Sequence, residues 1–181
     1  MKKDIQLMNN RFEIARIKYK PDKIKYLLIA ESPPDESSNR FFYYECVDEK
    51  DSLFLETMKV LYPNDYTDAK TARKRKKQFL KKFKDDGFYL IDSTNQPVPS
   101  FSRTKKLSQI KKTLPILKEK INGLVEKNTK IILISSTVYE ICEEPLKRMG
   151  FNIINEEMID FPGSGGQVKY RTKMAKLLDN R

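Results

Sequence analysis

Carboxylates and hydroxyls that could take part in hydrolysis gather in one short segment, residues 30–39 of the 181-residue chain. This segment contains Glu31, Ser32 and Asp35, and the adjacent prolines 33 and 34 make its backbone stiff. A carboxylate held at a fixed position can orient a water molecule for attack on a substrate. We therefore name Glu31, Ser32 and Asp35 as candidate catalytic residues.

Four aromatic residues, Phe41 to Tyr44, follow this segment. A planar base could stack on Phe42 or Tyr43, and such stacking contributes about 1–3 kcal/mol per base. The same rings could instead fill the hydrophobic core beneath the loop. Both interpretations stay open at the level of the sequence.

A second segment, residues 159–167, has three glycines within four positions. Glycine lets the backbone approach a ligand closely, and the helix expected to follow offers free N–H groups to an anion. The segment lacks the Gly-Lys-Ser/Thr ending of a P-loop, and its late position argues against a dinucleotide fingerprint. A tight connection without a ligand is the alternative. The candidate nucleic-acid contacts here are Gly163, Ser164, Gly165, Gly166 and Gln167.

Positive charge is concentrated in residues 70–84, which hold nine Lys or Arg residues and no acid, in a chain of net charge +11. Such a segment could contact a phosphate backbone through counterion release, or it could be a solvated helix face. The candidate phosphate contacts in it are Arg73, Lys74, Arg75, Lys76 and Lys77.

Several classes of site are excluded by composition. The chain has no histidine, and its two cysteines, Cys46 and Cys142, lack metal-ligand spacing and are too few for an iron–sulfur cluster. We therefore expect no metal and no cofactor. The longest apolar stretches are too short to cross a bilayer, and the N-terminus lacks the apolar core of a secretory signal. We expect a cytoplasmic protein with no membrane partner.

The elements that would position these residues alternate between short apolar strands and amphipathic helices. Strands are expected at 24–30, 88–91, 130–134 and 152–154, and helices at 4–19, 53–62, 69–84, 105–126, 138–149 and 167–178, with Pro115 kinking or dividing the fourth helix. This alternation predicts an α/β fold with a mostly parallel sheet covered on both faces. Ligands bind such sheets beyond the carboxyl ends of the strands, and the first motif segment lies there. We expect one domain over residues 1–181, with residues 1–20 as an N-terminal helical extension.

The order of four segments resembles the uracil-DNA glycosylase superfamily. Tyr26–Pro33 is similar to that family's first strand and motif loop, and the segments 88–95, 130–134 and 161–164 are similar to its second strand, third strand and last loop. The resemblance covers roughly residues 24–178. It implies a three-layer α/β/α sandwich around a four-stranded, mostly parallel sheet.

The resemblance also implies roles for particular residues. Glu31 would position the hydrolytic water, and Phe42 or Tyr43 would stack on a flipped base. Asp92 or Asn95 would read the edge of the base, and Ser164 matches the serine of the last loop. The chain departs from the family where a histidine would stabilise the departing base, because Asp160 or Phe161 stands there. A carboxylate at that place would oppose the growing negative charge, so we count Asp160 as a base-binding candidate only.

Three functions are compatible with these features. The first is hydrolysis of an N-glycosidic bond in DNA or another nucleic acid. The second is a non-catalytic nucleic-acid-binding module of the same fold, and the third is binding of a small nucleotide or sugar phosphate. We expect a nucleic-acid partner, with DNA favoured, and a monomeric protein.

Overall fold

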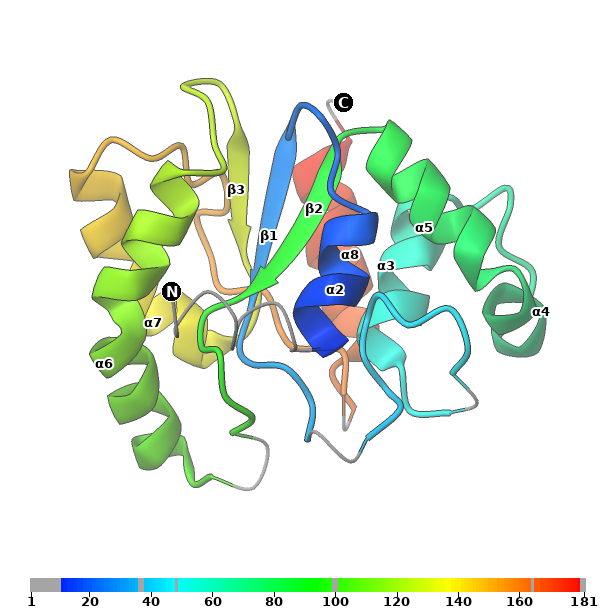
Figure 1. The fold of residues 1–181 in the computed structure, drawn as a ribbon, viewed down its shortest axis with the longest axis horizontal. Helices are drawn as coiled ribbons and strands as arrows, with labels where there is room; N and C mark the ends of the chain where they lie inside the picture. The colour runs from blue at the N-terminus through cyan, green and yellow to red at the C-terminus, as the bar shows by residue number, and fades with distance from the viewer. Residues whose placement is uncertain (1–10, 36–37, 48, 99–100, 164, 180–181) are drawn as a thin grey trace.

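A three-stranded parallel sheet lies at the centre of the protein. The computed structural model describes residues 11–35, 38–47, 49–98, 101–163 and 165–179 (Figure 1). The strands are β1 (Tyr26–Ala30), β2 (Phe88–Asp92) and β3 (Lys130–Leu133), in the order β2-β1-β3. Leu28 of β1 is in register with Leu90 on one side and Ile132 on the other. The expected α/β class and parallel sheet are confirmed.

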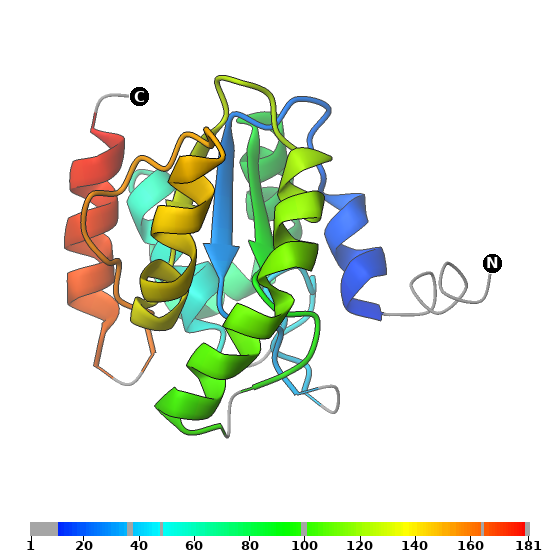
Figure 2. The same ribbon diagram turned by 90° about the vertical axis from the view of Figure 1, so that its left-hand side faces the viewer.

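Helices cover both faces of this sheet (Figures 1 and 2). On one face lie α6 (Arg103–Asn122) and α7 (Ser136–Arg148), which pack against each other. The other face carries α3 (Ser52–Leu61), α5 (Lys76–Asp85) and α8 (Gln167–Leu178), with the short α4 (Ala69–Lys74) leading into α5. The helix α2 (Arg11–Lys18) lies along the β2 edge. Within the described residues, no helix combines the length and the apolar character needed to cross a membrane.

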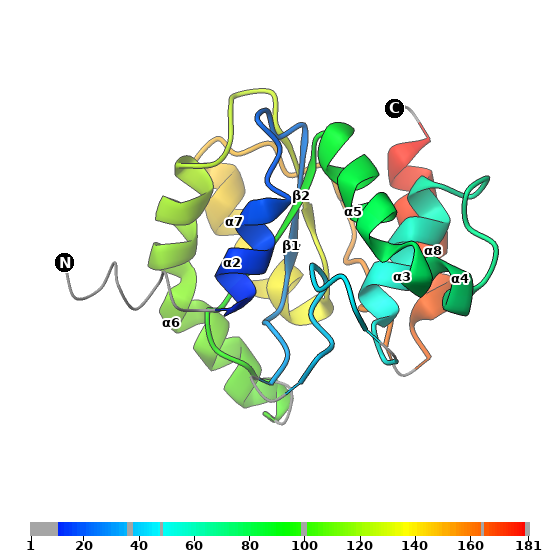
Figure 3. The same cartoon turned by 45° about the vertical axis from the view of Figure 1, so that its right-hand side comes forward.

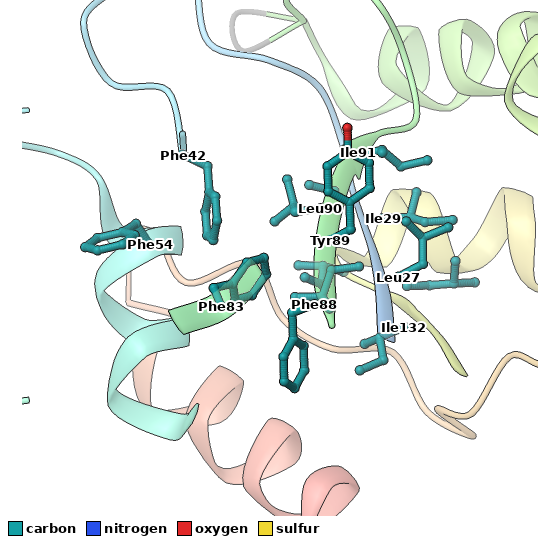
Figure 4. Packing of buried hydrophobic residues seen from close by; sticks show 14 of the residues in the cluster. Leu27, Ile29, Phe42, Phe54, Phe83, Phe88, Tyr89, Leu90, Ile91 and Ile132 are labelled. Atoms are coloured by element: carbon teal, nitrogen blue, oxygen red, sulfur yellow. The ribbon is translucent and has the colours of Figure 1, made fainter. Parts of the chain in front are cut away.

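The strands are almost continuously apolar because both of their faces are buried. Leu27, Leu28 and Ile29 of β1 are each 0% exposed. Beside them Phe83 of α5 stacks on Phe88 of β2, with 5.3 Å between the ring centroids. Figure 4 shows these rings between the sheet and α3. The core thus fixes the strands, whose carboxyl ends then carry the loops of interest.

The expected fourth strand is absent, so the prediction of a four-stranded sheet is wrong. The segment 152–159 runs beside β3 but makes only isolated parallel bridges, Ile131 with Ile153 and Ile134 with Ile159. Between these two bridges, the side chain of Asn155 makes the hydrogen bonds to β3 that a neighbouring strand would make. Its Oδ1 accepts a hydrogen bond from the Leu133 N–H at 3.0 Å, and its Nδ2 donates to the Leu133 carbonyl at 3.3 Å. One amide side chain therefore satisfies backbone groups that a continuous strand would otherwise pair.

The helices also differ from expectation in two places. The basic helix expected at 69–84 is two helices, α4 and α5, separated at Arg75. No glycine or proline causes this break; it accompanies the convergence of Arg73 and Lys76 on the carboxylate of Asp51. In contrast, α6 runs from Arg103 to Asn122 with Pro115 inside it, so the helix is not divided. The helix expected at 4–19 is described only from Arg11, because residues 4–10 lie outside the described part.

Candidate functional site

A cleft of about 1090 Å³ lies at the carboxyl edge of the sheet. Both motif segments line it, the first through residues 31–35 and the second through Asp160, Phe161 and the three glycines. Figures 1 and 3 show these two segments at the same end of the sheet, toward which the strand arrows point. The two segments are more than 120 positions apart in the sequence, and the parallel sheet brings them together.

Glu31 follows β1 directly and is held by several elements. Its carbonyl accepts hydrogen bonds from the Ser93 hydroxyl at 2.6 Å and the Thr94 N–H at 3.3 Å. Its carboxylate Oε1 accepts from Lys106 Nζ at 2.6 Å, and Oε2 accepts from the Thr137 hydroxyl. About a sixth of the side chain (17%) remains exposed. Glu31 is therefore a hydrogen-bond acceptor fixed in the cleft.

The other two candidate catalytic residues line the same cleft. The Ser32 hydroxyl accepts a hydrogen bond from the Val98 N–H at 3.3 Å, so this side chain joins the first loop to the segment after β2. Asp35 is exposed, and its carbonyl accepts from the Ser38 N–H at 2.8 Å. Of the three, Ser32 thus joins two loops, whereas Asp35 is the most exposed.

The candidate stacking rings are placed differently from each other. Phe42 is 5% exposed, contacts Phe54 and Phe83 edge to face or tilted, and lines the cleft. Tyr43 is 1% exposed, and its hydroxyl bonds the backbone of Leu90, accepting from N–H at 2.7 Å and donating to the carbonyl at 3.1 Å. Tyr43 does not line the cleft. This placement removes Tyr43 from the base-stacking candidates.

Two phenylalanines that we did not name as stacking rings stand at the cleft. Phe101 is 40% exposed and Phe161 is 45% exposed, and both line it. Phe101 precedes α6 and Phe161 precedes α8, and these two helices cover opposite faces of the sheet. The signal in the sequence is a single phenylalanine among turn-forming residues (Pro-Ser-Phe-Ser and Asp-Phe-Pro-Gly), where no core periodicity accounts for it.

Asp92 reaches the cleft but is already engaged. It lies at the end of β2, and its Oδ2 pairs with Nη2 of the buried Arg16 at 2.7 Å. Burial raises the pKa of the Asp92 carboxyl above its usual range, and the Arg16 charge opposes this shift. Asn95 is exposed and faces a separate small depression beside Lys120, outside the cleft.

Asp160, a predicted base-binding residue, is also in an ion pair. Its carboxylate lies 2.9 Å from Lys173 Nζ on α8. The ammonium group of Lys173 lowers the pKa of Asp160, so this carboxylate is negatively charged at neutral pH. Its negative charge in the cleft is therefore balanced by α8.

The glycines of the second segment have steric reasons for their identity. Gly165 has a φ of +92°, a backbone conformation that residues with a side chain rarely adopt. A Cβ on Gly166 would lie 2.3 Å from the Phe161 carbonyl oxygen. Gly163, Gly165 and Gly166 line the cleft, and Gln167 begins α8 without lining it. Ser164 lies outside the described residues.

Cations from several elements surround the cleft. Arg103 and Lys106 come from α6, and Arg103 donates to the Ser136 hydroxyl at 3.1 Å. Arg40, Lys50 and Lys169 are exposed and line it as well. Sequence reasoning missed these cations because they are scattered along the chain rather than grouped in a run.

The basic segment behaves only in part as expected. Lys74, Arg75 and Lys77 are exposed. Lys76, however, is 0% exposed, and its Nζ lies 3.3 Å from Asp51 Oδ2 and 4.4 Å from the centre of the Phe54 ring. This burial removes Lys76 from the candidate nucleic-acid contacts. Arg73 pairs with the other oxygen of Asp51 at 2.8 Å and is only partly exposed.

Metal-binding side chains are not grouped in the described part of the chain, where no three Cys, Asp or Glu residues could hold an ion together. Comparisons with known proteins provide no relative: no protein-family model, no curated protein and no solved structure matches this chain. The functional argument therefore depends on the residues of the cleft.

Proposed function

We propose that the cleft binds a nucleic acid, with one base inside it and neighbouring bases stacked at its rim. The observation that carries this proposal is that exposed aromatic rings and exposed cations line one cavity. Phe101 and Phe161 offer stacking faces, while Arg40, Lys50 and Lys169 offer charges for phosphates. Proteins that bind single strands combine these same two features.

A polymer fits better than a free nucleotide because the positive surface continues beyond the cleft. Asp51 lines the cleft and pairs with Arg73 of α4 and Lys76 of α5, so the two basic helices lie directly behind the cleft wall. Lys74 and Lys77, exposed on these helices, extend the positive charge away from the cavity. A free nucleotide in the cleft would be too small to contact these outer charges.

We also propose a relationship to the uracil-DNA glycosylase superfamily, and the arrangement of the two loops supports it. In both cases two motif loops meet at the carboxyl edge of a parallel sheet flanked by helices. Hydrolysis of an N-glycosidic bond is the second candidate function, and it is favoured by Glu31 and Asp35 lining the same cavity as Phe42. Binding ranks first because Glu31, Asp92 and Asp160 each already pair with a cation.

Binding is tested by fluorescence anisotropy with a labelled 12-nucleotide single strand at 50 mM salt. The double variant Phe101→Ala, Phe161→Ala should bind at least about tenfold more weakly, because each stacked base contributes about 1–3 kcal/mol. The variant Met149→Ala removes an apolar side chain of similar exposure, 50%, outside the cleft and should bind as the wild type does. Wild-type protein that fails to bind at micromolar concentration would refute the proposal.

Hydrolysis is tested separately on strands and duplexes that contain uracil, hypoxanthine, xanthine or alkylated bases, followed by alkaline cleavage of abasic sites. A product that disappears in the Asp35→Asn variant supports the enzyme. No product from any of these bases excludes it for this set and leaves the binding function unaffected.

A further inference from the structure

Glu31 differs from Asp51 and Asp92, the two most buried carboxylates in the described lining of the cleft, and from Asp160, whose ion pair with Lys173 is made through Oδ2. Asp51 is 1% exposed at its side chain and has a cation on each oxygen, and Asp92 is 6% exposed and pairs with Arg16. Glu31 keeps 17% exposure and has one hydrogen-bond donor on each oxygen. A carboxylate has about four acceptor positions. Each carboxylate oxygen of Glu31 therefore retains one acceptor position. Lys106 and Thr137 hold the two oxygens in place from either side.

Fixed, paired acceptors select a particular ligand edge. Two parallel N–H donors, about as far apart as the carboxylate oxygens, can bond both oxygens at once. Among the common bases, guanine alone has two adjacent donors on its pairing edge, N1–H and the 2-amino group. Uracil has one N–H between two carbonyls, and adenine and cytosine have an amino group beside a ring-nitrogen acceptor. Those acceptors would face the carboxylate with like partial charge.

We infer that Glu31 is a specificity residue that accepts N1–H and the 2-amino group of a guanine base held in the cleft. This inference rests on the proposed nucleic-acid binding and names the base. Lys106 and Thr137 are then positioning residues, since they hold the two oxygens in place without contacting the base. Arg40, Lys50 and Lys169, the exposed cations that line the cleft, would contact the phosphates of the same nucleotide.

The experiment compares seven-nucleotide strands of thymidines with one central substitution, measured by anisotropy with wild-type protein. Guanine should bind about tenfold or more tightly than hypoxanthine, which lacks only the 2-amino group, because a bidentate base contact discriminates by about 1–3 kcal/mol. N1-methylguanine, which lacks the other donor, should lose at least as much. Adenine and cytosine should bind no better than hypoxanthine.

The variant Glu31→Gln replaces one acceptor with a donor and should bind all of these strands within about threefold of one another. Glu144→Gln is the matched control, since it makes the same change in an exposed carboxylate that pairs with Arg148, and neither of these two residues lines the cleft. It should keep the guanine preference. Thermal melting of both variants establishes that they are folded.

The outcomes separate the inference from the function beneath it. Wild-type protein that binds guanine and hypoxanthine strands equally refutes the inference and leaves nucleic-acid binding intact. A Glu31→Gln variant that is folded and keeps the guanine preference refutes the assignment to Glu31. Absence of binding to every strand refutes the proposed function itself. If the variant does not fold, the wild-type comparison with the two altered bases still tests whether the protein recognises both donors of guanine.

Discussion

Lys76 is a fully buried cation, and its surroundings explain both how it is tolerated and what it costs. Its ammonium group lies over the Phe54 ring and near the Asp51 carboxylate and the Phe41 carbonyl. Burial lowers the pKa of Lys76 from 10.5 to about 8, although Asp51 opposes the shift. Holding this charge inside at neutral pH therefore reduces stability.

The stability of the protein should accordingly rise with pH between about 8 and 10. In that range Lys76 is protonated in the unfolded chain but not in the folded protein, so unfolding takes up a proton. Proton uptake becomes less favourable as the pH rises, and the free energy of unfolding therefore increases. The shift corresponds to an upper limit of roughly 3 kcal/mol. Lys120, whose pKa burial also lowers to about 8, contributes in the same direction. From about pH 9 the buried Cys142 thiol opposes part of the rise, because burial raises its pKa from 9.0 to about 12. Above pH 10 the buried tyrosines oppose it as well, because burial raises the pKa of groups such as Tyr43.

The variant Lys76→Met should flatten this rise without abolishing it, since Lys120 remains. Arg73 still pairs with Asp51 in the variant, so the aspartate keeps a counterion. Urea unfolding at pH 7, 8, 9 and 10 gives the free energy of unfolding at each value. A variant whose stability climbs as steeply as that of the wild type would show that Lys76 does not carry the effect.

Residue roles were only partly predictable from the sequence. The turn signals around Pro33 and Gly163 identified both cleft loops, because proline and glycine act on the local backbone. Nothing within the run of nine cations marks Lys76 as the buried one, since its partner Asp51 lies on another segment. Tyr43 and Phe42 are likewise adjacent in sequence, and only packing decides which of them reaches the cleft.

At the scale of elements, the edge of β3 depends on Asn155. Its amide bonds both backbone groups of Leu133 and is 2% exposed. Asn155→Leu leaves a buried N–H and carbonyl unpaired, and each such group costs about 1–3 kcal/mol. We expect a loss of at least about 2 kcal/mol in the free energy of unfolding, measured in urea at pH 7. Asn152→Ala, at an exposed position whose contact to β3 is through its backbone carbonyl, should change stability by less than about 1 kcal/mol.

The turn before α8 depends on Gly166 for a steric reason. Because an added Cβ would lie 2.3 Å from the Phe161 carbonyl oxygen, Gly166→Ala must displace the turn that presents the Phe161 ring. We expect at least about threefold weaker binding of the labelled strand. Gly123→Ala is the matched control, since its nearest neighbours would lie 3.7 Å from the new atom. Equal binding by Gly166→Ala and the wild type would show that the turn does not position the ligand.

Hydrophobic periodicity predicted most elements, including the three strands and the bounds of α8, because each is apolar on the faces it buries. It failed at the fourth strand and at the α4–α5 break. In both places the local structure involves a polar side chain, which a hydrophobic pattern cannot indicate. Asn155 bonds the backbone of β3 in place of a fourth strand, and Asp51 pairs with Arg73 next to the break between α4 and α5.

At the scale of the whole molecule, exposed positive charge lies on helices of both faces of the sheet. The cleft is surrounded by cations, and the exposed lysines of α4 and α5 lie behind one of its walls. Exposed lysines also occur on α6, including Lys111 and Lys112, outside the cleft lining. Net charge alone predicts that all of these lysines contribute equally to binding a polyanion. A defined path for the strand predicts that they do not.

Salt dependence distinguishes these two cases. Each phosphate contact on a single strand contributes about −0.7 to the slope of log affinity against log salt concentration. The double variant Lys74→Gln, Lys77→Gln should therefore reduce the steepness of the slope by about 1.4 if both lysines contact phosphates. Lys111→Gln, Lys112→Gln removes the same charge from α6 and should leave the slope nearly unchanged. Equal slopes for the two variants, measured by anisotropy between 50 and 200 mM salt, would mean that the strand does not follow α4 and α5, because a diffuse attraction to net charge affects both sites alike.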